Sequence, residues 1–186
     1  PALFPLATRA HLAARDVEAA LDAAERYTDA HPDNPASWRE RGSVLGAAGR
    51  YEDAIGAFDA ALSLDPEDAR ALRGRGVANL RLERFGAAAD DARRAADADP
   101  RWLEPRFLLG LIEESLGRAD AAEAAYRAAL EIDPSHWQTM VRLAALRLSA
   151  EDRTEAEALA ARAVRASDGA PAAEEMLARA RAAGAD

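Results

Sequence analysis

The chain has 186 residues, among them 51 Ala, 24 Arg and neither Lys nor Cys. Acidic residues outnumber basic ones by 33 to 24, which gives a formal net charge of −9. No segment approaches the roughly 20 consecutive apolar residues that a membrane-spanning helix needs, and the lack of Cys excludes disulfides and thiol chemistry. A strongly acidic chain also binds nucleic acid poorly, so we expect neither a membrane span nor a nucleic-acid partner.

The same residue types return every 34 positions along the sequence. This spacing separates five alanines and four prolines: Ala20, Ala54, Ala88, Ala122 and Ala156, and Pro32, Pro66, Pro100 and Pro134. No residue is inserted or deleted between them. The spacing therefore predicts one domain, 1–186, built from repeats 1–34, 35–68, 69–102, 103–136 and 137–170, followed by a capping helix over 171–186.

Each repeat predicts two short helices. In the second repeat the first helix starts near Asn34-Pro35, and the other follows the turn at Gly49 and ends before Pro66, because proline cannot continue a helix. Asp68 and Ser135 are expected to be caps or first-turn residues of the first helices in later repeats. Helix pairs this short cannot bury their apolar sides alone, so an all-α stack of pairs is expected. In the last helix, Ala173, Leu177 and Ala180 are expected to share the apolar side.

The repeat carries the pattern of a known family most completely between residues 35 and 68. The matching residues are Trp38, Gly42, Leu45, Gly49, Tyr51, Ala54, Phe58, Ala61, Leu62 and Pro66. The pattern resembles the tetratricopeptide repeat, a 34-residue helix-turn-helix. The resemblance implies a right-handed α-solenoid of about eleven antiparallel helices whose concave groove, lined by the first helices, binds partner proteins. Arg41 and Arg75 stand where the family prefers Leu, and we expect their stems to cover the core and their charged ends to lie in water.

Positions 2, 5, 9 and 12 of each repeat lie on one side of the first helix, and the resemblance implies that this side lines the groove. The first fourteen positions of the five repeats hold 10 Arg and 4 acids, whereas the other twenty hold 12 Arg and 26 acids. This distribution predicts a partner segment with acidic and apolar residues. The candidate contact residues are Arg39, Arg70, Arg73, Val77, Phe107, Leu111 and Val141, with Arg81 at the margin of the groove. Solvated arginines and ordinary packing of Phe107 with Leu111 are the alternative.

The sequence contains no convincing set of catalytic residues. His11, His31 and His136 lie far apart, and neighbouring carboxylates such as Asp90 and Asp91 point in different directions on a helix. There is no phosphate-binding loop and no nucleophile motif, so we expect no enzymatic activity, no metal and no cofactor. Relatives that clamp a C-terminal carboxylate use Lys, Asn and Arg, and Asn79 falls on the packing side, so this clamp is not expected.

The repeats differ in the size of the apolar side chains that they can bury. At the repeat position of the bulky rings Phe58 and Tyr126, the third repeat has Ala92. Each missing large side chain removes about 1 to 3 kcal/mol of apolar burial. The helix over 85–98 is therefore predicted to be the least stable layer of the stack.

Two classes of function remain. The first is a non-catalytic scaffold or adaptor that binds a partner segment, and the alternative is a non-catalytic arm of a larger enzyme or assembly from which this segment was cut. Leu3 and Phe4 add apolar surface near the first residue, so self-association through that end is a further hypothesis. Arg as the sole strong cation, together with abundant Ala, indicates a bacterial gene. The compartment, cytoplasm or periplasm, stays open.

Overall fold

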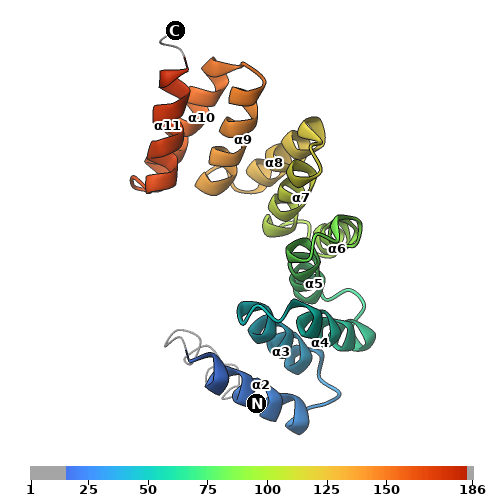
Figure 1. Ribbon diagram of the computed structural model, residues 1–186. Coiled ribbons are helices and arrows are strands. Elements are labelled where there is room, and N and C mark those ends of the chain that lie inside the picture. Colours follow the sequence, from blue (N-terminus) through green and yellow to red (C-terminus); the bar gives the residue numbers. More distant parts are fainter. Residues whose placement is uncertain (1–15, 184–186) are drawn as a thin grey trace. The chain divides into compact units, whose positions relative to one another are not determined.

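The computed structural model describes residues 16–183, and within this range all regular structure is helical. The described residues form ten helices (Figure 1): α2 (Val17–Ala30), α3 (Pro35–Ala47), α4 (Tyr51–Leu64), α5 (Ala69–Arg81), α6 (Phe85–Ala98), α7 (Glu104–Ser115), α8 (Ala119–Ile132), α9 (Trp137–Ser149), α10 (Arg153–Ala166) and α11 (Pro171–Ala182). The all-α solenoid class predicted from the sequence is confirmed. None of these helices is long and apolar enough to cross a membrane. The expected first helix, with Leu3, Phe4 and His11, lies outside the described residues.

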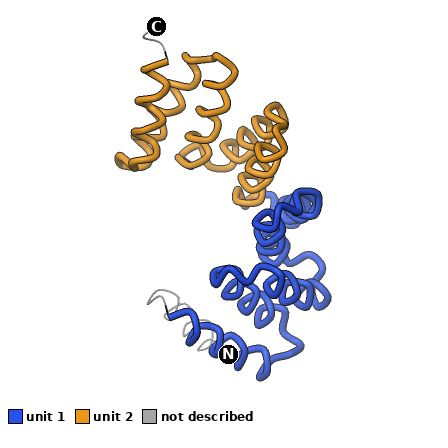
Figure 2. Tube along the Cα trace, viewed as in Figure 1, with its two compact units in different colours: residues 1–100 blue, residues 101–186 orange. Residues whose placement is uncertain are grey.

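The helices gather into two compact units, one comprising residues 1–100 and the other residues 101–186 (Figure 2). In unit 1, α3 pairs with α4 and α5 pairs with α6, while α2 packs on α3 and α4 packs on α5. In unit 2, α7 pairs with α8 and α9 pairs with α10, and α11 packs on both α10 and α9. These pairs coincide with the predicted helices of the repeats, and the division of the chain into five repeats within one domain stays a prediction.

Side-chain caps explain why several helices begin where they do. The Asn34 side chain accepts a hydrogen bond from the Ala36 amide at 3.0 Å, and Asp68 accepts one from the Arg70 amide at 3.0 Å. The expected cap at Ser135 is wrong, because α9 begins one residue later, after His136. Ser135 instead donates its backbone and hydroxyl hydrogens to Asp133 at 2.8 and 2.6 Å, and these bonds lower the pKa of the Asp133 carboxyl.

The turn between the two helices of a repeat uses left-handed backbone at one fixed position. Gly49 and Gly117 have φ angles of 77° and 70°, and Glu83 and Glu151, at the same repeat position, have φ angles of 57° and 62°. Glycine takes this conformation without a steric penalty, whereas glutamate does not. Gly49 therefore correctly indicates a turn in the sequence. The repeats that contain Glu83 and Glu151 form the same turn without glycine.

Rings packed on glycines hold the stacked helices close together. The Phe58 ring of α4 lies against Gly42 of α3 and Gly74 of α5, and the Tyr126 ring of α8 lies against Gly110 of α7. Phe58 is 3% exposed and Tyr126 is fully buried. The absence of side chains at these glycines is what lets the rings sit between helices. This packing sets the spacing of α3 and α5, which bound a cavity in unit 1.

Helix α11 closes the apolar side of unit 2, as the sequence predicts for a capping helix. Ala173 and Ala180 are buried and Leu177 is half-buried. Met176, which the sequence pattern did not single out, is 3% exposed and packs into the same cluster as Tyr126 and Leu159. Helix α11 therefore supplies part of the core of unit 2.

Candidate functional site

Unit 1 contains a cavity of about 440 Å³ among α3, α4 and α5. Three of the eight candidate contact residues lie on its wall: Arg73, Val77 and Arg81. The other lining residues are Gly42, Ser43, Gly46, Ala47, Tyr51, Phe58, Gly74 and Ala78. Two arginines and a valine of α5 thus face small residues of α3 across this cavity.

The composition of α3 creates the space. Its residues at the cavity, Gly42, Ser43 and Gly46, carry at most a hydroxymethyl group, and a Cβ atom added at Gly46 would meet its nearest neighbour only at 4.0 Å. The buried Phe58 ring lies beneath them. The cavity therefore combines an apolar floor with cationic side chains on one wall, an arrangement that suits an acidic side chain beside an apolar one.

The remaining unit 1 candidates, Arg39 and Arg70, do not line this cavity. Arg39 forms an ion pair with Asp68, the residue that caps α5, and its side chain is 26% exposed. This pair links α3 to the start of α5. Arg70 is exposed on the first turn of α5. Sequence reasoning placed Arg39, Arg70 and Arg73 together on this face, whereas of these three only Arg73 lies at the cavity, together with Arg81.

Unit 2 contains a separate cavity of about 390 Å³ bounded by α7, α9 and α11. Two candidates, Phe107 and Val141, lie on its wall. The other lining residues are Trp137, Gln138, Arg142, Ala145, Ala172, Glu175, Met176 and Arg179. Leu111 is half-buried, packs against the main buried cluster of this unit and does not line the cavity.

Phe107 is held in place by two other rings. Its centroid lies 5.8 Å from that of Tyr126 and 5.4 Å from that of His136, which it meets edge to face. The Tyr126 hydroxyl donates to the Glu114 carboxylate at 2.7 Å, and Glu114 pairs with Arg142 at 3.4 Å. Burial, with the bond to Glu114, raises the pKa of Tyr126 well above its usual value, so the phenol stays protonated as a donor.

Arg75 corrects one expectation from the sequence. Its guanidinium donates to Asp91 at 2.9 and 2.6 Å and also pairs with Asp59, so its charged end is bound to carboxylates. The bond to Asp91 raises the pKa of Arg75 far above its usual range. Asp91 is buried and also accepts a bond from Asn79 at 3.4 Å. Its neighbour Asp90 is exposed, as expected for adjacent helical residues.

A larger cavity of about 740 Å³ surrounds the Arg75 cluster among α4, α5 and α6. Its arginines are already engaged: Arg75 with two carboxylates, Arg93 with Asp90 at 3.1 Å, and Arg94 with the Pro66 carbonyl at 2.8 Å. A ligand there would have to break these contacts, so this cavity is a weaker candidate site. Arg41, the other arginine at a Leu position, pairs with Glu25 at 3.2 Å and lies over the Trp38 ring.

No group of three or more His, Asp or Glu side chains in residues 16–183 is placed to hold a metal ion. The residues that sequence reasoning did not connect with the site are mainly those of α11, namely Ala172, Glu175, Met176 and Arg179. A repeat pattern predicts that the first helices line the groove. It does not predict which side of a terminal helix faces them.

Comparison with known proteins identifies the family to which the repeat belongs. Two tetratricopeptide repeat models match the chain, one over residues 7–54 and 40–101 and the other over residues 103–136. The chain is also 33% identical over 98 residues to the Hsp70-Hsp90 organizing protein of Triticum aestivum, an alignment that covers 53% of this chain and 17% of that protein. The chain thus spans a small part of the length of this curated relative.

Solved structures show the same fold. TTC0263, a thermophilic tetratricopeptide repeat protein of Thermus thermophilus, superposes with a TM-score of 0.74 at 22% identity, over 95% of this chain and 94% of that one. YrrB, a tetratricopeptide repeat protein with an unusual peptide-binding site, superposes with a TM-score of 0.69 at 20% identity, over 90% and 87%. The matched models, the fold and the 34-residue spacing agree: the chain belongs to the tetratricopeptide repeat family.

Proposed function

We propose that this chain is a non-catalytic scaffold that binds a segment of a partner protein on the first helices of its repeats. The observation that carries the proposal is the unit 1 cavity, where Arg73, Val77 and Arg81 of α5 stand over an apolar floor. The partner segment would place an acidic side chain against the arginines and an apolar side chain on the floor.

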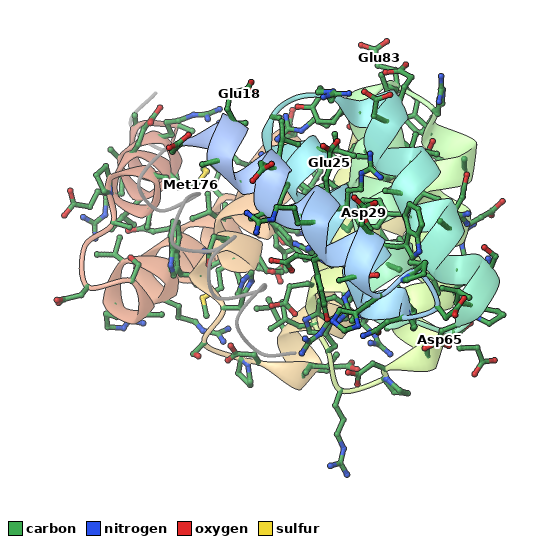
Figure 3. The ribbon with its side chains drawn as sticks, turned by 90° about the horizontal axis from the view of Figure 1, so that it is seen from below. Glu18, Glu25, Asp29, Asp65, Glu83 and Met176 are labelled. Atoms are coloured by element: carbon green, nitrogen blue, oxygen red, sulfur yellow. The ribbon has the colours of Figure 1, made fainter. Side chains whose placement is uncertain are left out.

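The distribution of charge supports an acidic partner at this cavity. Acidic residues crowd the second helices and the turns, and Figure 3 labels five acidic residues, all exposed: Glu18, Glu25, Asp29, Asp65 and Glu83. An acidic segment would be repelled from such surfaces and attracted to the arginines of α5. Charge therefore favours binding at α3 and α5 over binding at α4 and α6.

Known relatives support the general class. They include the Hsp70-Hsp90 organizing protein and a protein with a peptide-binding site. Family membership and an open cavity favour a role in protein binding without catalysis. The residues of this chain also disfavour acid–base chemistry, because the adjacent carboxylates Asp90 and Asp91 are each paired with an arginine, Asp90 with Arg93 and Asp91 with Arg75.

A peptide selection tests the proposal without a known partner. Purified protein is used to select binders from a displayed random-peptide library, and the affinity of the selected peptides is measured at several salt concentrations. We expect enrichment of Asp and Glu beside apolar residues, and binding that weakens as salt rises. Arg73→Glu and Arg81→Glu should each weaken binding at least tenfold and flatten its salt dependence.

Arg26→Glu is the matched control, because Arg26 is exposed on α2 and does not line the cavity. It should leave the affinity within about twofold of the parent, as expected for a distant screened charge. Selected peptides that bind Arg73→Glu and Arg81→Glu as well as the parent would refute the proposed site.

A further inference from the structure

We infer that unit 2 carries its own pocket for a large apolar side chain flanked by carboxylates, and that the capping helix α11 forms one wall of it. This inference rests on the proposed function and adds an occupant and a second location to it. The family models match the chain only as far as residue 136, whereas the pocket walls on α9 and α11 lie beyond that residue. Family membership therefore does not assign this pocket.

The floor of the pocket is apolar and built from three helices. Phe107 of α7, Val141 of α9 and Met176 of α11 converge there, and Met176, labelled in Figure 3, is the most buried of them at 3% exposure. Trp137 adds a half-buried ring at the first turn of α9. A volume of about 390 Å³ exceeds what one aromatic or branched aliphatic side chain occupies, so such a group fits with part of its backbone.

Four residues on one side of helix α11 line this pocket. Ala172, Glu175, Met176 and Arg179 are spaced by three, one and three residues, which places them on one side of a helix. Met176 points to the core side of this edge, and the other three are exposed. Ala172 contributes only a methyl group to this wall. Helix α11 thus forms the third wall of the pocket as well as covering the core.

The rim determines the charge of the occupant. It carries two guanidinium groups, Arg142 and Arg179, and one carboxylate, Glu175. Arg142 makes only a long contact of 3.4 Å to Glu114, and among the described residues Arg179 makes no ion pair within 4.0 Å. The nearby Arg181, by contrast, pairs with Glu157 at 2.8 Å. A rim with excess cations in a chain of net charge −9 attracts acidic flanks.

Two buried methionines make the pocket directly observable. The chain has two Met residues, both in unit 2: Met176 lines the pocket, and Met140 lies in a neighbouring cluster and does not. Labelling Met methyl groups with carbon-13 gives one signal for each, and Met140→Leu assigns them. The probe is the blocked peptide Glu-Gly-Phe-Gly-Glu, compared with versions in which Ala replaces Phe or Lys replaces Glu.

The Phe peptide with Glu flanks should shift the Met176 signal in a saturable way and move the Met140 signal much less. The Ala peptide should bind at least tenfold more weakly, and the Lys-flanked peptide should also bind more weakly than the Glu-flanked one. No saturable shift of Met176, or equal shifts from the Phe and Ala peptides, would overturn the inference. Tighter binding of the Lys-flanked peptide would overturn the assigned charge.

A matched pair of substitutions on α11 locates the contact. Ala172→Trp should block the entrance and reduce the Met176 shift at least tenfold at equal peptide concentration, whereas Ala178→Trp, at an exposed position outside the pocket, should leave it unchanged. Retained binding in Ala172→Trp would place the peptide elsewhere. Absence of a Met176 shift in the parent, while Arg73 and Arg81 still govern the binding of selected peptides, would refute only this pocket, and the reverse result would refute only the unit 1 site.

Discussion

The ring of Tyr126 lies so close to Gly110 that a Cβ atom on Gly110 would overlap three of the ring carbons. The same relationship joins Phe58 to Gly42, where an added Cβ would lie 2.8 Å from the ring carbon Cε1. These glycines are therefore required for packing, although they occupy helix interiors, where glycine is normally unfavourable.

Overpacking a core costs about 1 to 3 kcal/mol, and Ala normally brings a gain of about 1 kcal/mol to a helix interior. Gly110→Ala should consequently lower the free energy of unfolding by up to about 2 kcal/mol. Gly56→Ala on α4, where an added Cβ meets nothing within 4 Å, is the control and should raise stability by about 1 kcal/mol. Urea unfolding followed by circular dichroism measures both, and equal midpoints would contradict this packing.

The buried pair of Arg75 and Asp91 gives a second prediction. Arg75→Leu restores the residue type that the family prefers but leaves the Asp91 carboxylate buried without its cation. The expected loss is about 3 to 5 kcal/mol. Adding Asp91→Ala should recover most of it, because the equivalent residues Ala57 and Ala125 are buried in the other repeats. Urea unfolding measures the single and double variants, and a double variant as unstable as Arg75→Leu alone would show that the ion pair is not the cause.

Acid should weaken unit 2 through Asp152. The bond from Arg147, at 2.8 Å, and the backbone bond from Glu155 lower the pKa of the Asp152 carboxyl below its usual range. A lowered pKa adds stability above the unfolded value of about 4, and this contribution is lost as the pH falls through the folded value. Asp152→Asn keeps a helix cap but removes the charge.

The stability difference between the parent and Asp152→Asn should therefore be largest near neutral pH and shrink below about pH 4. Thermal unfolding at a series of pH values measures this difference. Asp97→Asn is the control, because Asp97 is exposed on α6 and has no side-chain partner among the described residues. A difference for Asp152→Asn that stays constant or grows toward low pH would contradict the assigned role.

Helix α6 is predicted to exchange its amide hydrogens faster than α4. Its buried side chains are Ala88, Ala89, Asp91, Ala92 and Ala95, with no large apolar group among them, whereas α4 buries Phe58 and Leu62. Fewer apolar contacts lower the free energy of local opening. Hydrogen exchange followed by NMR measures the amide exchange rates of both helices in one sample. Slower exchange in α6 than in α4 would contradict this prediction.

Helix positions followed from the sequence because prolines, caps and the 34-residue spacing are local signals. Tyr51–Leu64 and Pro171–Ala182 begin as predicted, whereas α9 begins one residue later than a cap at Ser135 predicts, and the Ser135 amide and hydroxyl donate to Asp133. The partner of each arginine did not follow from the sequence. Whether a guanidinium meets Asp91 or solvent depends on a residue one helix away, which no repeat pattern specifies.

The candidate site was predictable in part. Spacing placed Arg73 and Val77 on the side of α5 that meets the cavity, and Arg81 at the margin of that side. The pairing of Arg39 with Asp68 and the participation of Met176 depend on tertiary contacts between elements far apart in the sequence. The single-domain organisation, the N-terminal self-association and the alternative of an arm of a larger enzyme stay predictions.

Partner binding on the first helices of the repeats can be mapped residue by residue in an amide NMR titration with a peptide selected on the purified protein. We predict chemical-shift changes concentrated on α3 and α5 around Gly46, Arg73 and Val77, with small changes on α4 and α6. Changes concentrated instead on the exposed faces of α4 and α6, with α3 and α5 unaffected, would contradict binding on the first helices.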